Sequence, residues 1–287
     1  SGRLQIFLSR NKLNEKLDEA KDLDLGDIIG VKGILFRTNT DELTVDLDSF
    51  ELLTKSLKPM PEKHKGLTDI ETIYRKRYLD LMSNPESREV FIKRNKIIKS
   101  LRTNLESNGF LEVETPMMHP IPGGANARPF ETHHNALDKK LYLRVAPELY
   151  LKRLLVGGYE KVFEINRNFR NEGISTIHNP EFTMLEFYEA YGDLQRTAKF
   201  IQKLIQDSIL VVNDSLKITY DQKNINFEKD FEIRSLKELV KEELNVESLE
   251  NEEDIFDLAK KKKIKIEKNW GWGLSLIHIS EPTRQFR

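Results

Sequence analysis

The stretch that decides the fold runs from residue 166 to residue 188 and reads NRNFRNEGISTIHNPEFTMLEFY. An apolar run, KVFEI at residues 161–165, precedes it, and a second, FTMLEF at residues 182–187, forms most of its later half. The segment between the two runs is polar and contains Gly173, a residue typical of tight turns. The pattern predicts two antiparallel strands joined by a polar loop.

Three side chains of this predicted hairpin suit a nucleotide. On a strand, alternate residues share a face, so Arg170 and Glu172 are expected to project together. A guanidinium binds a phosphate with two parallel hydrogen bonds, and a carboxylate accepts from an amino group. The ring of Phe182 offers a face for a base. Taken alone, Arg170 and Glu172 are better explained as a cross-strand ion pair, which contributes roughly 0.2–1 kcal/mol.

The residues before the hairpin predict a β-rich beginning and one long helix. Turn signals separate three strand-like runs, which suggests a small barrel or sandwich, although three strands cannot close a five-stranded barrel. These runs lie at residues 4–8, 27–35 and 44–53, with a polar helical piece at 11–21. A basic connector containing proline follows. Asn84 is then a good N-cap before Pro85, and Asn108-Gly109 ends the predicted helix.

After the hairpin the pattern becomes weaker. Helical spacing predicts one helix soon after the hairpin and two amphipathic helices near the end, and two short runs between them are strand-like. The predicted helices are 194–212, 235–244 and 252–263, and the predicted strands are 217–220 and 231–233.

Composition excludes several classes of function. The formal net charge of −1 gives no overall attraction to nucleic acid, so any such contact depends on local patches. The chain has no cysteine, which excludes a disulfide framework, a thiolate zinc site and a cysteine nucleophile. No stretch approaches about 18 consecutive apolar residues, and the start has no apolar leader. We therefore expect a cytoplasmic protein.

The hairpin string resembles the second signature motif of class II aminoacyl-tRNA synthetases, which is Phe-Arg-x-Glu, a loop, then His or Arg, and Phe on the returning strand. The matching residues are Phe169, Arg170, Glu172, His178 and Phe182. The segment NGFLEVETP at residues 108–116 resembles the first signature motif, a helix and strand ending in proline that forms the dimer interface in the family.

Within class II, the detail resembles the lysyl-tRNA synthetases over residues 1 to about 273. Three segments carry this resemblance: PIPGGANARPF at 120–130, APELYLKR at 146–153 and HNPEFTMLEFY at 178–188. Aspartyl and asparaginyl relatives usually have Ser-Pro-Gln in place of Ala-Pro-Glu. A lysine ammonium needs carboxylates, and Glu148 and Glu186, on strand segments flanking the motif, could supply them. Without the surrounding string, Glu148 is better explained as a surface glutamate at a proline turn.

The resemblance implies a role for each matching residue. Arg170 is the expected catalytic residue, because it would hold the α-phosphate of ATP and neutralise charge in the transition state. The ATP-binding residues it implies are Arg170, Asn171, Glu172, His178, Asn179 and Phe182. The lysine-binding residues it implies are Gly124, Glu148, Glu186 and Tyr188. The implied dimer interface contains Gly109, Phe110 and Pro116. The implied partners are L-lysine, ATP with Mg²⁺, tRNA(Lys) and a second copy of the chain.

The resemblance also implies an α+β fold and a domain order. We expect a partial OB-fold β-barrel that binds the anticodon at residues 1–58 and a linker at 59–83. An incomplete class II catalytic domain, an antiparallel sheet flanked by helices, is expected at 84–273. The third signature motif and the metal-binding carboxylates are not found, so we expect no metal ligands within this chain and little activity from the 287 residues alone.

The last residues, 274–287, depart from the family. The string LSLIHISEPTR at 274–284 reads as the translation of a common sequencing-library adapter, which predicts a non-native tail. A short amphipathic tail is the alternative.

Two other functions are compatible with the sequence. One is a paralogue of the catalytic domain that lysylates a protein, although such paralogues lack the barrel expected at 1–58. The other is a non-enzymatic fragment that binds RNA or a partner. Exchange of pyrophosphate into ATP in the presence of lysine distinguishes the non-enzymatic fragment from the ligase.

Overall fold

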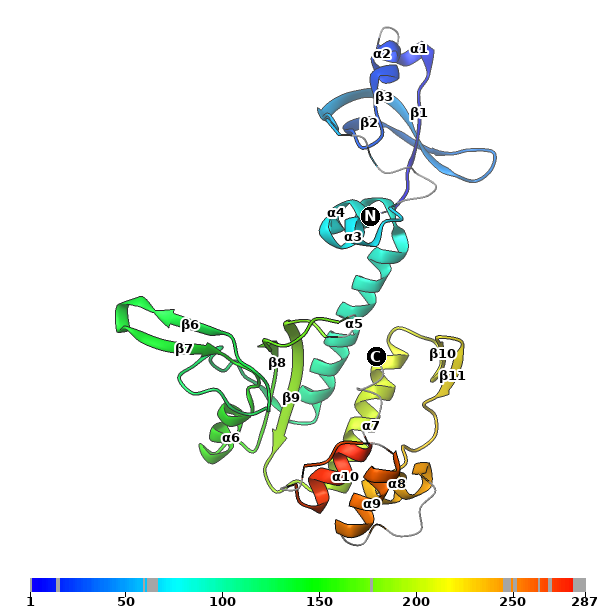
Figure 1. The fold of residues 1–287 in the computed structure, drawn as a ribbon. Helices are drawn as coiled ribbons and strands as arrows, with labels where there is room; N and C mark the ends of the chain where they lie inside the picture. The colour runs from blue at the N-terminus through cyan, green and yellow to red at the C-terminus, as the bar shows by residue number, and fades with distance from the viewer. Residues whose placement is uncertain are drawn as a thin grey trace. The chain divides into compact units, whose positions relative to one another are not determined.

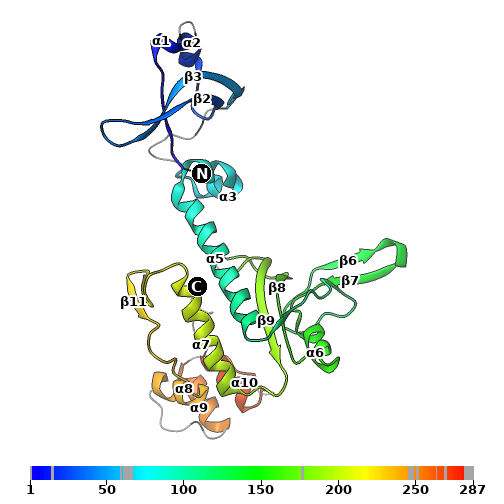
Figure 2. The same cartoon turned by 180° about the vertical axis from the view of Figure 1, so that it is seen from behind.

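The computed structural model describes residues 2–13, 16–58, 60, 67–175, 178–244, 249, 252–262, 264–267 and 270–280. Contacts divide the chain into two compact units, Ser1–Thr103 and Asn104–Arg287. Both units mix small sheets with helices (Figures 1 and 2). In the described part of the chain, no helix combines the length and the apolar character needed to cross a bilayer.

The first unit begins with a three-stranded sheet and its short helices and continues into three further helices. In chain order these are β1 (Gln5–Phe7), α1 (Arg10–Leu13), α2 (Lys16–Glu19), the 3-10 turn η1 (Ala20–Asp22), β2 (Ile28–Arg37), β3 (Leu43–Thr54), α3 (Ile70–Arg75), α4 (Arg77–Ser83) and α5 (Pro85–Ser107), which extends into the second unit. The three predicted strands and the helical piece between the first two are thus confirmed.

The sheet of the first unit has the order β1-β3-β2, with β1 parallel and β2 antiparallel to β3. Its buried cluster contains Leu13, Val45, Leu47 and Phe50. The register of β2 shifts between Lys32 and Gly33. A Cβ atom on Gly33 would lie 2.2 Å from the carbonyl oxygen of Asp46, so only glycine fits this close approach.

The predicted linker, 59–83, contains α3 and α4 in its described part; residues 59 and 61–66 lie outside the described residues. The α3 helix begins where the carboxylate of Asp69 accepts a hydrogen bond from the backbone nitrogen of Thr72 at 2.7 Å. In α4, Arg77 holds the buried carboxylate of Asp80 at 2.7 Å. These local bonds give the connector helical structure that its composition did not indicate.

The predicted helix boundaries of α5 are confirmed. The side chain of Asn84 accepts from the backbone nitrogens of Glu86 and Ser87 at 3.0 and 3.4 Å. At the other end Gly109 has φ +82°, a conformation that favours glycine. The backbone nitrogen of Phe110 then donates to Leu105 at 3.1 Å and that of Gly109 to Glu106 at 2.9 Å, which is the Schellman arrangement.

In its described residues, the second unit contains three small sheets and its helices. In chain order they are β4 (Leu111–Glu112), β5 (Met118–His119), β6 (Glu131–His134), the 3-10 turn η2 (Asn135–Leu137), β7 (Lys139–Leu143), α6 (Glu148–Val156), β8 (Lys161–Phe169), β9 (Glu181–Glu189), α7 (Leu194–Leu210), β10 (Lys217–Tyr220), β11 (Lys223–Asn226), α8 (Leu236–Leu244), α9 (Glu252–Lys262) and α10 (Trp272–Ser280). The sheets have the orders β4-β8-β9, β5-β7-β6 and β10-β11.

The β8–β9 pair is the predicted hairpin, and its two strands are antiparallel as expected. Figures 1 and 2 show α6 and α7 on opposite sides of it. The face toward α7 is aromatic: the ring of Phe187 lies 5.4 Å from that of Phe110 and 5.5 Å from that of Phe200 on α7. Side chains on a strand alternate between faces, so this packing leaves the other face of the hairpin to the polar residues.

One sequence prediction for the second unit needs correction. The predicted strand at 231–233 is irregular, and β10 pairs instead with β11. Asp221 and Gln222 between them have φ +47° and +62°, which makes the tight turn of a two-residue hairpin. The two later helices are confirmed as α8 and α9, with Lys263 outside the described residues.

The predicted tail begins inside α10, whose Leu276 and Ile279 are buried with Val240, Leu249 and Ile255. Residues 281–287 lie outside the described residues. The non-native origin of the tail stays a prediction.

Candidate functional site

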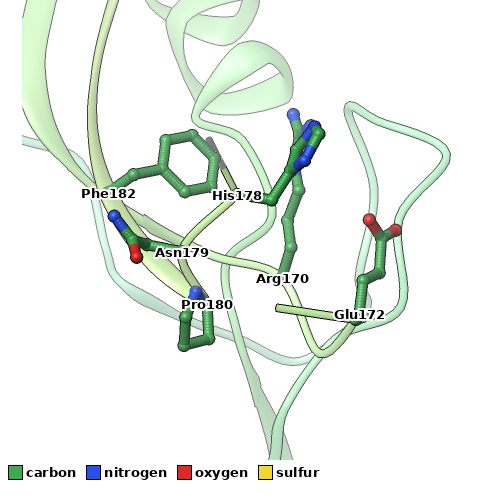
Figure 3. A pocket seen from close by; sticks show the side chains of 7 residues that line it. Arg170, Glu172, His178, Asn179, Pro180 and Phe182 are labelled. Atoms are coloured by element: carbon green, nitrogen blue, oxygen red, sulfur yellow. The ribbon is translucent and has the colours of Figure 1, made fainter. Parts of the chain in front are cut away.

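The loop of the β8–β9 hairpin encloses a pocket of about 230 Å³. Five of the predicted site residues line it together, and Figure 3 shows their side chains around one opening. The lining residues are Arg170, Glu172, Gly173, His178, Asn179, Pro180 and Phe182. The sequence prediction placed Arg170 and Glu172 on a strand. This is wrong, because β8 ends at Phe169 and both residues belong to the loop.

Arg170 is the best-anchored residue of the pocket. Its backbone nitrogen donates to the carbonyl oxygen of Pro180 at 2.8 Å, which fixes the point where the loop leaves the strand. Its guanidinium carbon lies 5.2 Å from the ring centre of Phe182, so the cation sits against the ring. Its Nε is buried and has no hydrogen-bond partner among the described residues. A buried donor without a partner favours binding of an anionic ligand here.

Of the remaining pocket residues, Glu172, Gly173, His178 and Asn179 are exposed, whereas Pro180 and Phe182 are partly buried. Nδ1 of His178 lies 2.8 Å from Oγ of Ser175, and the two residues also form a backbone bridge across the loop. Thr176 and residue 177 lie outside the described residues. Asn171, which the resemblance assigned to ATP, is not among the residues that line the pocket. Its backbone nitrogen donates instead to Arg128 at 2.8 Å, which ties the loop to the preceding segment.

A second polar cluster lies farther along the same face of β9. The hydroxyl of Tyr188 donates to Oε2 of Glu186 at 3.0 Å, and both side chains are half-buried. Phe182, Glu186 and Tyr188 are separated by even numbers of residues, so they share one face of the strand. The Cα atoms of Phe182 and Glu186 are therefore about 13 Å apart along the strand.

Glu148 joins this cluster from a different element than predicted. The sequence prediction placed it on a strand, but Glu148 is the first residue of α6, because Pro147 before it has the helical φ of −84° and starts the helix. Oε1 of Glu148 pairs with Nζ of Lys152 at 2.6 Å, one turn along α6. A Cβ atom on Gly124, which has φ +89°, would lie 3.1 Å from the Cβ of Glu148. The predicted Gly124 and Glu148 are thus packed side by side.

The electrostatic environment of the cluster favours binding of a cation. Burial raises the pKa of Glu186, and the nearby carboxylate of Glu148 raises it further. The hydrogen bond from Tyr188 lowers the pKa of Glu186 in part. Burial and the neighbouring Glu186 in turn raise the pKa of the Tyr188 hydroxyl, which stays a donor. An ammonium group bound here would relieve the repulsion between the two carboxylates.

A buried ion pair that was not predicted from the sequence lies next to this cluster. The side chains of Arg144 and Glu164 are 0% and 1% exposed, and Nη1 of the arginine lies 2.8 Å from Oε1 of the glutamate. A signal for both was present, because each interrupts an apolar run, LYLRVA and KVFEI, where a charged residue is rare unless it is paired.

The residues predicted for the dimer interface have contacts within the chain. Gly109 caps α5, and the ring of Phe110 is buried against Phe187 and stacked on Phe200 at 5.5 Å. The carbonyl oxygen of Pro116 accepts from Nε2 of the buried His119 at 2.8 Å. Contact of these residues with a second copy stays a prediction.

A resident metal centre does not fit the part of the chain that the structure describes. Among those residues, no group of three or more His, Cys, Asp or Glu side chains could hold an ion. No chemical step is therefore assigned to a protein-bound metal.

Comparison with known proteins finds a matching family and close relatives. A family model described as tRNA synthetases class II (D, K and N) matches residues 69–272. The chain is 54% identical to a lysine–tRNA ligase of Carboxydothermus hydrogenoformans over 286 residues, which covers 98% of the chain and 58% of that protein. It is 55% identical to a lysine–tRNA ligase of Neisseria meningitidis serogroup B over 242 residues, covering 84% of the chain and 48% of that protein. It is 57% identical to one of Legionella pneumophila strain Lens over 240 residues, with the same coverage. The chain spans about half the length of these curated relatives.

Proposed function

The chain belongs to the class II tRNA synthetases of the D, K and N group, and on that premise we propose that the protein containing it is a lysine–tRNA ligase. It activates L-lysine with ATP and transfers the lysyl group to tRNA(Lys). One observation carries the choice of lysine: Glu186 and Glu148 form a half-buried acidic cluster on the face of the hairpin that also bears the Arg170 pocket.

In this proposal the loop pocket holds ATP. The fork of Arg170 binds the α-phosphate, and Phe182 stacks on the adenine. Glu172 accepts from the amino group of the adenine, and His178, Asn179 and the neighbouring Asn171 surround the nucleotide. ATP enters as its Mg²⁺ complex, so the ion comes with the substrate.

In the same proposal, the acidic cluster binds lysine next to the ATP pocket. Glu186 and Glu148 bind the ammonium groups, Tyr188 orients Glu186, and the backbone at Gly124 lies close to the amino acid. Neutral side chains of the same length leave the repulsion between these two half-buried carboxylates uncompensated, which selects against such side chains. The substrate carboxylate is then directed toward the phosphate held by Arg170.

The chemistry needs no protein nucleophile. An oxygen of the lysine carboxylate attacks the α-phosphorus of ATP, and pyrophosphate leaves to give lysyl-adenylate. A terminal ribose hydroxyl of the tRNA next attacks the activated carbonyl and releases AMP. The protein contributes positioning and stabilisation of the charge on the phosphate oxygens, and the position of Arg170 in the loop pocket supports the second role for this residue.

The first unit is proposed to serve the tRNA. Phe7 and Phe36 lie on β1 and β2 with rings 6.3 Å apart, and they are 53% and 37% exposed, which suits stacking with unpaired bases. We assign residues 1–58 to a partial OB-fold module for the anticodon, 59–83 to a connector and 84–273 to the catalytic domain. We also propose a homodimer that acts in the cytoplasm, where tRNA is charged.

Exchange of labelled pyrophosphate into ATP tests the proposed function. In the longest gene product that contains this chain, lysine is expected to support exchange, while aspartate and asparagine are not. Equal exchange with aspartate or asparagine would contradict the assignment of lysine. RNA binding without exchange for any amino acid would instead indicate a non-enzymatic function.

Replacing Phe182 by leucine is expected to raise the KM for ATP about tenfold, because the aromatic stack on the base is lost. The KM for lysine should change little, since the acidic cluster is four residues away on the strand. Steady-state exchange at varied ATP measures the effect. Phe169→Leu, on the opposite face of the hairpin, is the matched control. An unchanged KM for ATP in Phe182→Leu would exclude the stacking role.

A further inference from the structure

Two carboxylates of the hairpin lie directly opposite each other. Glu164 on β8 is paired in register with Glu186 on β9, so both side chains project from the same face with Cβ atoms about 5 Å apart. Like charges in this position repel each other. Glu186 is half-buried and belongs to the acidic cluster, whereas Glu164 is fully buried.

A buried network satisfies Glu164. Nη1 of Arg144 approaches Oε1 of Glu164 at 2.8 Å, and the hydroxyl of Thr115 donates to Oε2 at 2.6 Å. Nδ2 of Asn166 also donates to Oε1, at 3.1 Å. Nε of Arg144 is fixed by the carbonyl oxygen of Arg167 at 2.9 Å. These hydrogen bonds fix the guanidinium of Arg144 in one orientation, next to the carboxylate of Glu164.

Stability alone does not account for this network. Moving two charges out of water is costly, and apolar pairs of similar size often replace buried ion pairs without loss of stability. The position of the Arg144–Glu164 pair, opposite Glu186, gives the pair an effect beyond stability. Arg144 follows β7 and precedes α6 in the chain, and its guanidinium, which is bound to Glu164, also acts electrostatically on Glu186, the residue opposite Glu164.

We propose that Arg144 is a positioning residue for the amino-acid site, which holds Glu164 as its own partner and thereby leaves Glu186 ionised and available to a cationic side chain. The proposal rests on the proposed function for the identity of the ligand, but its electrostatic part concerns Glu186 alone. It explains why a fully buried arginine lies next to a site that binds a cation. The arginine compensates for Glu164, not for the ligand.

The groups that face Glu186 come from four places in the fold. They are Tyr188 on the same strand, Glu164 on β8, Glu148 on α6 and Arg144 after β7. Arg144 lowers the pKa of Glu186, whereas Glu164 and Glu148 raise it. Removing the arginine charge should therefore raise the pKa of Glu186, and removing Glu164 should lower it. Removing both should leave it near its original value.

The test measures the ionisation of Glu186 directly. The 287-residue chain is labelled with ¹³C at the glutamate carboxyl carbons, and the signal of Glu186 is assigned by its loss in Glu186→Gln. Carboxyl titrations are then followed by NMR in the original protein, in Arg144→Met, in Glu164→Gln and in the double variant Arg144→Met/Glu164→Met. Arg144→Lys, which keeps the charge, is the conservative variant.

The expected pKa of Glu186 is higher in Arg144→Met, lower in Glu164→Gln and restored in the double variant and in Arg144→Lys. If Arg144→Met fails to fold, the pKa of Glu186 in Glu164→Gln and in the double variant still tests the proposal. An unmoved pKa of Glu186 in Glu164→Gln, or a pKa in the double variant far from the original, overturns the proposal. A purely structural role for Arg144 predicts no such opposite shifts.

Lysine binding by calorimetry separates this proposal from the proposed function. Arg144→Met is expected to bind lysine several-fold more weakly at pH 6 than the original chain, with the difference vanishing at pH 9. Opposite pKa shifts with no lysine binding by the longest gene product that contains this chain would support the role of Arg144 and count against lysine as the ligand. Weakening that is equal at both pH values would overturn the role of Arg144.

Discussion

Replacing Arg170 by alanine is expected to reduce lysine-dependent exchange of pyrophosphate into ATP about a thousandfold. In the proposed function, the change removes the fork that binds the α-phosphate, where negative charge would develop as the lysine carboxylate attacks. Loss of one such preorganised donor commonly costs about 2.7–4 kcal/mol of transition-state stabilisation. Arg170 meets the structural requirement, because its Nε is buried with no hydrogen-bond partner in the described part of the chain and its guanidinium is held against Phe182. The measurement is the exchange rate at saturating lysine and ATP.

Two variants test whether the effect is specific to the guanidinium of Arg170. Arg170→Lys keeps the charge but loses the planar fork, so it should recover only part of the rate. Arg167→Ala removes a neighbouring arginine whose side chain is exposed and lies 3.5 Å from Glu181 on the other face of the hairpin. It should exchange at the original rate. If Arg170→Ala and Arg167→Ala were equally impaired, the loss would be one of folding and the assignment would fail.

Replacing Glu186 by glutamine is expected to raise the KM for lysine about a hundredfold, with little effect on the KM for ATP. Glutamine keeps the shape of the side chain and still accepts from Tyr188, so the change isolates the charge. Removing one partner of a desolvated charge pair costs about 2–5 kcal/mol. The measurement is exchange at varied lysine concentration.

The dependence of this KM on pH gives a second test of Glu186. Burial and Glu148 raise the pKa of Glu186, so its carboxylate becomes protonated at higher pH than an exposed glutamate. Because lysine needs the ionised form, the KM of the original protein should rise as the pH falls toward that raised pKa. The KM of Glu186→Gln should stay flat over the same interval. Glu181→Gln, at an exposed position of the same strand, is the matched control and should follow the original protein.

Parts of the fold that depend on neighbours in the chain could be predicted well. The caps of α5 at Asn84 and Gly109 use side chains and dihedral angles that the local sequence specifies. The β8–β9 hairpin follows from two apolar runs and a polar loop. Errors occurred where local signals were weak, as at 231–233, where the partner of β10 was decided by the turn at Asp221 and Gln222.

The candidate site also has a part that could be predicted from the local sequence and a part that could not. The residues of the loop pocket are close in sequence, and a single motif was sufficient to identify Arg170, Glu172 and Phe182 together. Glu148 was predicted as a site residue but assigned to the wrong element, because a proline before it can end a strand or begin a helix. Its neighbour Gly124 is packed against it from 24 residues earlier in the chain, a contact that follows from no local pattern.

The sequence by itself determined the family, the hairpin and the residue types that suit ATP and a cationic amino acid, since these depend on local patterns and on a motif. Only the tertiary structure decided which charges stand together. Arg144 and Glu164 are 20 residues apart and Thr115 is 49 residues from Glu164, yet they form one buried network behind Glu186. The physical reason is that a local pattern sets the backbone of each element, whereas the ionisation of a carboxylate depends on every charge packed around it.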